Sequence, residues 1–236
     1  KPVAALEPVN QIDVRLAGAP GGSILLTVRR AQSCGIRITS PAANAAVLTP
    51  EVLVSGTYPA SFGPDVGVTV KGTGALAGGG TFAALVPVDT QVTTLTSVAK
   101  NAAGTTLDDD TIPVTVQAGP AEPAVHLRAS PVQGVAPLSV ELTLVGNVPV
   151  TQVTLDQDGD GDIDFQGPAL EGVRFTYAQP GVYLALATAT TPGGLQHATL
   201  AVQAYDRPAL ESLLQARWTA MKNALRQGDV EGALLF

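Results

Sequence analysis

Cysteine is nearly absent from this sequence, with Cys34 the single example in 236 residues. A disulfide within the chain is therefore excluded. Two interpretations of Cys34 stay open, a buried free thiol or a bond to another chain.

Residues that carry common catalytic chemistry are also scarce. The chain has two histidines, His126 and His197, which lie in separate predicted strands without another metal ligand at zinc-binding spacing. Cys34 has no histidine close by in sequence, and no Gly-x-Ser-x-Gly motif is present. Gly78-Gly79-Gly80 lacks the lysine and following helix of a phosphate-binding loop. We therefore expect that this protein is not an enzyme.

Clustered positive charge and long apolar runs are missing as well. The formal net charge is −7, and the one adjacent basic pair is Arg29-Arg30, so a nucleic-acid partner is not expected. No apolar run approaches the roughly 20 residues of a membrane span, so no transmembrane segment is expected in this chain. Because the sequence opens on Lys1-Pro2 without a signal-like apolar core, we interpret it as a trimmed or mature piece of something longer.

The residues that are abundant favour short strands and tight turns. Val, Ala, Leu and Thr are frequent, and 25 Gly and 18 Pro are spread along the chain. In residues 1–35, apolar and polar residues alternate over Gln11–Ala17, and a second apolar strand covers Ser23–Arg29. Since a lone hairpin is marginal in water, residues 1–35 are predicted to complete another sheet, in this chain or in a different one. The segment resembles the closing hairpin of a surface module.

Residues 36–118 show six or seven short alternating segments separated by turn signals, which predicts a β-sandwich. The cluster Asp108-Asp109-Asp110 is interpreted as a solvated loop, with a metal site as the alternative. The segments Ser40-Pro41, Val54-Ser55-Gly56 and Asn101–Gly104 resemble those of bacterial immunoglobulin-like surface domains, which implies an immunoglobulin-like fold.

Residues 119–123 contain two prolines and are predicted to form a stiff linker. Residues 124–206 repeat the sandwich pattern around an acidic loop. Ala129-Ser130-Pro131, Gly134–Leu138 and Phe175–Tyr183 resemble a PKD-type domain, an immunoglobulin-like sandwich of surface and secreted proteins. A tryptophan often precedes the acidic turn in that family, and Leu155 stands there in this chain. Tyr183 is interpreted as a corner tyrosine with a core role.

Residues 207–236 change to a helical pattern. Apolar residues recur every three or four positions from Leu210 to Leu225, with Asp206 as the predicted N-cap. Gly228 is expected to end this helix, and Asp229 to cap a second helix over Val230–Phe236. This turn resembles that of a helical-hairpin repeat. The segment is interpreted as the start of a helical domain or as an oligomerisation helix.

The acidic loop has the spacing of a calcium site. Asp156, Asp158 and Asp160 occupy positions one, three and five of a calcium-loop template, Gly161 position six, and Asp162 would offer its carbonyl at position seven. Ile163 is expected to pack inward, and Asp164 to bind at position nine. Position twelve is Gly167, so the glutamate of an EF-hand is absent, and Glu171 is a possible late ligand. The sequence thus predicts Ca²⁺ bound by Asp156, Asp158, Asp160, Asp162 and Asp164, and the alternative is a solvated turn without an ion.

Two functions remain open for a mainly β chain of tandem immunoglobulin-like sandwiches, flanked by an N-terminal hairpin and a C-terminal helical hairpin. The first is a structural or adhesive segment of an extracellular or cell-surface protein, a spacer or filament-building unit whose partners are other modules or copies of itself. The second is an accessory glycan-binding region of a secreted polysaccharide-degrading enzyme. Sugar platforms usually need exposed aromatic rings, and the single Trp of this chain lies in the predicted helix, which favours the structural role.

Overall fold

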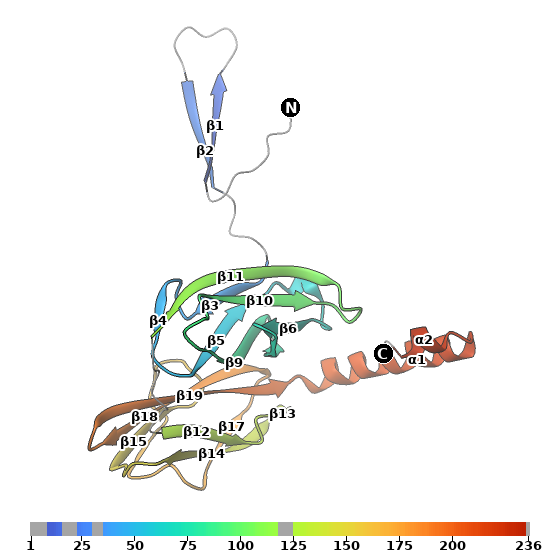
Figure 1. Ribbon diagram of the computed structural model, residues 1–236. Helices are drawn as coiled ribbons and strands as arrows, with labels where there is room; N and C mark the ends of the chain where they lie inside the picture. Colours follow the sequence, from blue (N-terminus) through green and yellow to red (C-terminus); the bar gives the residue numbers. More distant parts are fainter. Residues whose placement is uncertain (1–8, 16–22, 30–34, 118–124, 235–236) are drawn as a thin grey trace. The chain divides into compact units, whose positions relative to one another are not determined.

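The computed structural model describes residues 9–15, 23–29, 35–117 and 125–234 (Figure 1). The chain divides into two compact units, Lys1–Gly35 and Ile36–Phe236, and each is described by itself. Several sequence predictions fall outside the described residues: the last two residues of the predicted strand Gln11–Ala17, Cys34, the linker at 119–123, and the last two residues of the predicted helix Val230–Phe236.

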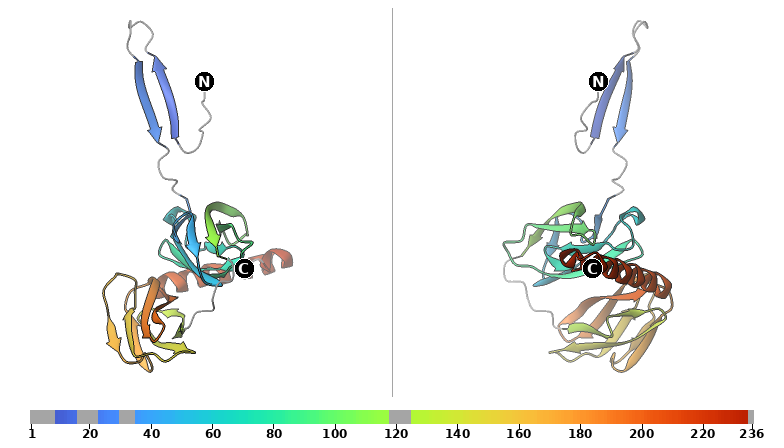
Figure 2. Two further views of the ribbon diagram at one scale, coloured as in Figure 1. Left: turned by 60° about the vertical axis from the view of Figure 1, so that its left-hand side comes forward. Right: turned by 90° about the vertical axis from the view of Figure 1, so that its right-hand side faces the viewer.

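The first unit contains one antiparallel strand pair, β1 (Val9–Arg15) and β2 (Ser23–Arg29) (Figure 2). Their register runs from Val9 opposite Arg29 to Arg15 opposite Ser23. The predicted strand at 11–17 thus begins two residues earlier in the structure, at Val9.

The first sandwich of the second unit consists of two sheets, in the strand orders β3-β5-β9-β8 and β4-β11-β10-β6-β7. Proline cannot donate a ladder hydrogen bond, so β3 ends at Ser40-Pro41, and the chain crosses to the other sheet, where β4 runs parallel to β11. The elements are β3 (Arg37–Ser40), β4 (Ala45–Val47), β5 (Glu51–Thr57), a 3-10 turn (Ala60–Phe62), β6 (Gly67–Val70), β7 (Thr73–Gly74), β8 (Leu76–Gly78), β9 (Thr81–Pro87), β10 (Thr94–Lys100) and β11 (Thr106–Val116).

The core between these sheets is mostly aliphatic. Its largest fully buried side chain is Phe82 of β9, which packs with Val54, Leu95 and other buried residues from both sheets. Alternating burial along β10 and β11 confirms the period-two pattern of the sequence.

The acidic cluster at 108–110 is not the solvated loop that the sequence predicts, because all three residues lie within β11. The backbone N–H of Ile36 donates to Asp108 Oδ2 at 3.0 Å, and that of Ile38 to Asp110 Oδ2 at 2.8 Å. These carboxylates therefore join the edge strand β3, and Ile36 immediately before it, to β11 of the other sheet by accepting their N–H groups. The Asp109 side chain points the other way along the strand alternation and is exposed.

Asp110→Ala is expected to destabilise the first sandwich by about 1–2 kcal/mol, because the N–H of Ile38 loses its partner in a half-buried position. Asp109→Ala, the matched control, should change the free energy of unfolding by less than about 0.5 kcal/mol. Chemical denaturation of the two variants measures the difference, and equal losses would contradict the role assigned to Asp110.

The second sandwich has the strand orders β12-β14-β17 and β13-β19-β18-β15-β16. Its first strand also stops at a Ser-Pro pair, Ser130-Pro131, and the chain crosses to pair β13 in parallel with β19. The elements are β12 (Val125–Ser130), β13 (Gln133–Val135), β14 (Leu138–Gly146), β15 (Gln152–Asp156), β16 (Phe165–Gly167), β17 (Val173–Tyr177), β18 (Gly181–Thr191) and β19 (Gly194–Tyr205).

Small side chains fill much of this second core. Ala185, Ala187 and Ala189 of β18 are fully buried against Leu142 and Leu155. Leu155 thus occupies the core immediately before the acidic loop.

Helix α1 (Arg207–Arg226) follows β19 directly, with Asp206 as N-cap: its side chain accepts a hydrogen bond from the N–H of Ala209 at 3.0 Å. Gly228, at φ 76°, ends the helix, and Asp229 caps α2 (Val230–Ala233). The predicted caps are confirmed, but the second helix is shorter than the predicted Val230–Phe236, because it ends at Ala233 with Leu234 as its C-cap. None of the described helices is long and apolar enough to cross a membrane.

Polar contacts join the second sandwich and α1 to the first sandwich. The side-chain amide of Gln203, a buried residue of β19, donates to the Ala77 carbonyl in β8. Arg217 of α1 pairs with Asp65, in the turn before β6. Residues 36–236 therefore contain direct contacts between the two sandwiches in addition to the covalent connection.

Candidate metal centre

The acidic loop is the tip of the β15–β16 hairpin. Leu155 pairs with Phe165 across the hairpin, and the N–H of Asp164 donates to the Leu155 carbonyl at 2.9 Å. Asp156 ends β15 and Asp164 immediately precedes β16. The ladder therefore places the first and last carboxylates of the loop side by side, although eight positions separate them in sequence.

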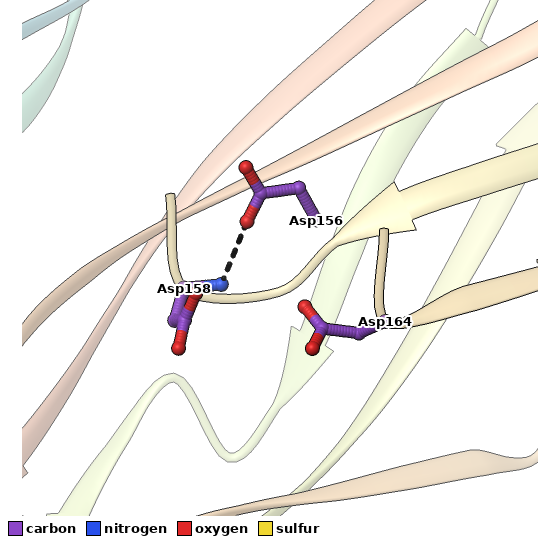
Figure 3. Close-up of side chains that lie close together, drawn as sticks. All are labelled: Asp156, Asp158 and Asp164. Atoms are coloured by element: carbon purple, nitrogen blue, oxygen red, sulfur yellow. Dashed lines mark hydrogen bonds between the residues drawn. The ribbon is translucent and has the colours of Figure 1, made fainter. Parts of the chain in front are cut away.

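Three of the five predicted ligands come together. One carboxylate oxygen from each of Asp156, Asp158 and Asp164 lies within 4.8 Å of the other two (Figure 3). Two oxygens on opposite sides of a Ca²⁺ ion are about 5 Å apart, since each Ca–O distance is about 2.3–2.6 Å. The spacing and the hard oxygen chemistry of this set both fit calcium.

The side chains of the other sequence-predicted positions lie outside this group. Asp160 and Asp162 are exposed and are not part of the convergent group. Glu171 is also exposed and outside it. Ile163 does not pack inward, as the sequence pattern predicts, because its side chain is 63% exposed. Ile163 lies in the hairpin tip outside the paired residues, next to Asp164, whose N–H donates to the Leu155 carbonyl and whose carboxylate accepts from the Gln157 N–H.

The loop is held in shape by its own backbone. Asp156 Oδ1 accepts from the N–H of Gly159 at 2.7 Å and of Asp158 at 3.3 Å, and Asp156 Oδ2 accepts from Gly161 N–H at 2.9 Å. Asp164 Oδ2 accepts from the N–H of Gln157 at 2.8 Å. These bonds orient two of the three convergent carboxylates, and a carboxylate's roughly four acceptor sites leave room for an ion as well.

The loop requires a glycine at position 159. Gly159 has φ 82°, and a Cβ there would lie 2.9 Å from the Leu184 carbonyl oxygen of β18. Both the left-handed backbone and the close approach to β18 exclude a side chain at this position.

The carboxylates of the loop repel one another. The pKa of Asp158 is raised, first by desolvation and then by repulsion from Asp160, with Asp164 and Asp156 adding to it. Among the described residues, no Lys or Arg forms an ion pair with a loop carboxylate. In the described part of the chain, backbone N–H groups are the partners of these carboxylates.

Two stacked tyrosines stabilise the loop, one of them through a direct hydrogen bond. Tyr177 of β17 is buried, and its hydroxyl donates to the Gln157 carbonyl at 2.9 Å. Tyr183 packs on it with 4.6 Å between ring centroids and donates to the Gln179 carbonyl at 2.7 Å, the corner role predicted from the sequence. Burial, with added repulsion from Asp158, raises the pKa of both hydroxyls, so both stay protonated donors.

Sequence reasoning missed the contact of Tyr177 with the loop. A signal was available, because a tyrosine at an inward position of a strand needs a partner for its hydroxyl. A second buried polar atom of the loop, Gln157 Oε1, has no hydrogen-bond partner among the described residues.

No protein-family model and no curated protein matches this sequence. Among solved structures, the chain is similar to fibronectin(III)-like modules of Clostridium thermocellum CbhA, with 15% identity over 72% of this chain and 94% of that one, at a TM-score of 0.27. It is similar to dimeric latent PorU from Porphyromonas gingivalis, with 14% identity over 72% of this chain and 20% of that one, at a TM-score of 0.35. It is also similar to a chimeric titin Z1Z2 tandem, with 12% identity over 72% of this chain and 99% of that one, at a TM-score of 0.24.

At these TM-scores the similarities carry no argument about activity, ligands or partners. The strand orders and the two separate cores define the class from the chain itself: a mainly β protein of tandem immunoglobulin-like sandwiches with a C-terminal helix. The predicted fold class is confirmed.

Proposed function

We propose that this chain is a non-enzymatic structural segment of an extracellular, multi-module protein, in which Ca²⁺ stabilises the second sandwich. The observation that carries the proposal is the convergence of Asp156, Asp158 and Asp164 at the tip of the β15–β16 hairpin. These three side chains would hold the ion, with Asp160 or water completing the shell. Bound calcium would supply the positive charge that offsets their mutual repulsion.

A structural role is supported by how the two sandwiches meet. The buried Gln203 amide bonds to Ala77, and Arg217 pairs with Asp65. Such contacts restrict the motion of one module on the next, as a spacer requires, and the partners of such a segment would be other protein modules or copies of itself.

Glycan binding has less support. Among the described side chains, Trp218 is the one aromatic residue classed as exposed, at 58%. It stands alone on α1 beneath Lys222, whose ammonium lies 5.7 Å from the ring centroid. A single ring does not form a sugar platform.

Single-molecule pulling tests both parts of the proposal. The second sandwich should unfold at a higher force in calcium than in chelator, because the ion ties the two strands of the β15–β16 hairpin together. The first sandwich, measured in the same traces, should unfold at the same force in both conditions. Asp156→Asn should remove the calcium effect and Asp162→Asn should keep it. Equal forces with and without calcium would contradict the proposal.

A further inference from the structure

The outer face of the second sandwich is buried at one end of β19 and open at the other. Val202 points into the second core, so the alternation of the strand places Ala201 and Gln203 on the opposite face. Both are nevertheless buried, with Gln203 at 3% exposure, whereas Leu195 on the same face is 63% exposed. The first sandwich, which Gln203 contacts through the Ala77 carbonyl, therefore covers only one end of this face.

The facing sheet of the first sandwich shows the same gradient of burial. Ser55 of β5 pairs with Ala83 of β9, and both are buried although neither belongs to the first core. Two residues along, Leu53 is half-buried and its partner Leu85 is 46% exposed, and at Glu51 the face is open. Because β9 lies against β18 and β19, the second sandwich covers Ser55 and Ala83. The contact between the sheets is thus confined to one end of both faces.

A cleft of about 540 Å³ lies where the two faces separate. Glu51 and Leu53 line it from the first sandwich, and Leu186 of β18 lines it from the second. The acidic loop forms part of the same wall, with Asp156 and Asp160 among the lining residues. None of the described residues that line the cleft is a lysine, arginine or histidine. Carboxylates of both sandwiches therefore surround one cleft, and like charges oppose the approach of its walls.

We propose that calcium closes this cleft, so that the ion bound at the acidic loop fixes the angle between the two sandwiches. The inference rests on the proposed calcium site. A divalent ion at the three convergent aspartates removes two negative charges from the wall that faces Glu51. Closure then buries Leu53 and Leu186, and the burial of apolar surface is the favourable term that it gains. The contact at Gln203 is the pivot, since burial is complete there.

The distance across the cleft measures closure directly. Leu195 lies eight positions before Gln203, roughly 27 Å along a strand, so a rotation of about 10° at the pivot moves it by about 5 Å. Leu48, next to the cleft residue Thr49, is the reference point on the first sandwich. Leu48 and Leu195 are both exposed, at 57% and 63%, and accept a label without loss of packing.

Double electron–electron resonance between nitroxides on Leu48→Cys and Leu195→Cys, in the 236-residue chain carrying Cys34→Ser, tests the proposal. Calcium should shorten this distance by about 5 Å relative to chelator. Labels on Val132→Cys and Leu195→Cys, both within the second sandwich, should keep their distance. Calorimetric titration of the same labelled samples reports ion binding separately.

A charge variant tests the cause of the opening. In chelator, Glu51→Gln should shift the distance between residues 48 and 195 toward the shorter, calcium-bound value. Asp109→Asn removes one charge from an exposed residue on β11 of the same sandwich, away from the cleft, and should leave the distance unchanged. Calcium binding with an unchanged or longer distance would overturn the closure and leave the calcium site standing. Absence of binding would overturn both, and equal shifts in the two variants would overturn the repulsion across the cleft.

Discussion

Calcium is expected to raise the melting temperature of the second sandwich by on the order of 10 °C when its free concentration is about 100 times the dissociation constant. Binding to the folded state alone contributes about 2.7 kcal/mol under that condition, and a domain of this size gains several degrees per kcal/mol. The physical source is the neutralisation of three carboxylates that lie within 4.8 Å of one another. Differential scanning calorimetry in calcium and in chelator measures the shift.

The variant Asp158→Asn should change the melting temperature in opposite directions in chelator and in calcium. The pKa of Asp158 is raised in the folded state, first by desolvation and then by repulsion from neighbouring aspartates. A carboxyl whose folded pKa lies above its unfolded value disfavours folding once it ionises, and the penalty disappears as pH falls below both pKa values. In chelator at neutral pH, Asp158→Asn should therefore melt above the wild type. In calcium it should melt below the wild type, because a ligand is lost.

The matched control is Asp162→Asn, which removes the same charge from an exposed residue outside the convergent group. It should keep most of the calcium-induced shift. A wild-type protein that melts at the same temperature in both buffers, or an Asp158→Asn variant that responds to calcium like the wild type, would show that the loop is an ordinary acidic turn.

Gly56→Ala is expected to destabilise the first sandwich by about 3 kcal/mol or more. A Cβ at Gly56 would lie 2.1 Å from the Arg37 carbonyl oxygen of β3 and 2.4 Å from the Phe82 ring. The ring can turn only by disturbing the core, and the carbonyl belongs to the paired strand, so neither neighbour can move freely. Urea unfolding of the first sandwich measures the loss.

Gly67→Ala provides the control for that substitution. Gly67 begins β6 of the same sandwich, and a Cβ there would meet no heavy atom within 4 Å. Its effect should stay within about 1 kcal/mol, and it is expected to be favourable because alanine restricts the unfolded chain. Equal losses for the two variants would mean that the packing around Gly56 differs from the arrangement described.

The sequence predicted those features that depend on local patterns. Alternation of apolar and polar residues located the strands, as β10 and β11 show, because each strand buries one face. The Ser-Pro pairs marked the ends of β3 and β12, since proline cannot continue a ladder. Asp206 and Gly228 located the ends of α1 for similarly local reasons.

Features that depend on pairing across the fold could not be predicted in the same way. Asp108 and Asp110 accept N–H groups from residues 72 positions away, and no local pattern carries that information. The same holds within the loop: regular spacing predicted side-chain ligands at Asp156, Asp158, Asp160 and Asp164, but the β15–β16 ladder brings Asp164 beside Asp156, and the Asp160 side chain lies outside the convergent group. Ile163 lies in the hairpin tip outside the paired residues and is exposed.

Isothermal titration of calcium into chelator-treated protein is the most direct test of the metal centre. The account predicts saturable binding of one ion per loop in the wild type and in Asp162→Asn, and its loss in Asp156→Asn. Thermal melting of Asp156→Asn in chelator would confirm that this variant stays folded. A wild-type titration with no saturable binding, or binding that Asp156→Asn retains unchanged, would contradict the assignment of Asp156, Asp158 and Asp164 as a calcium site.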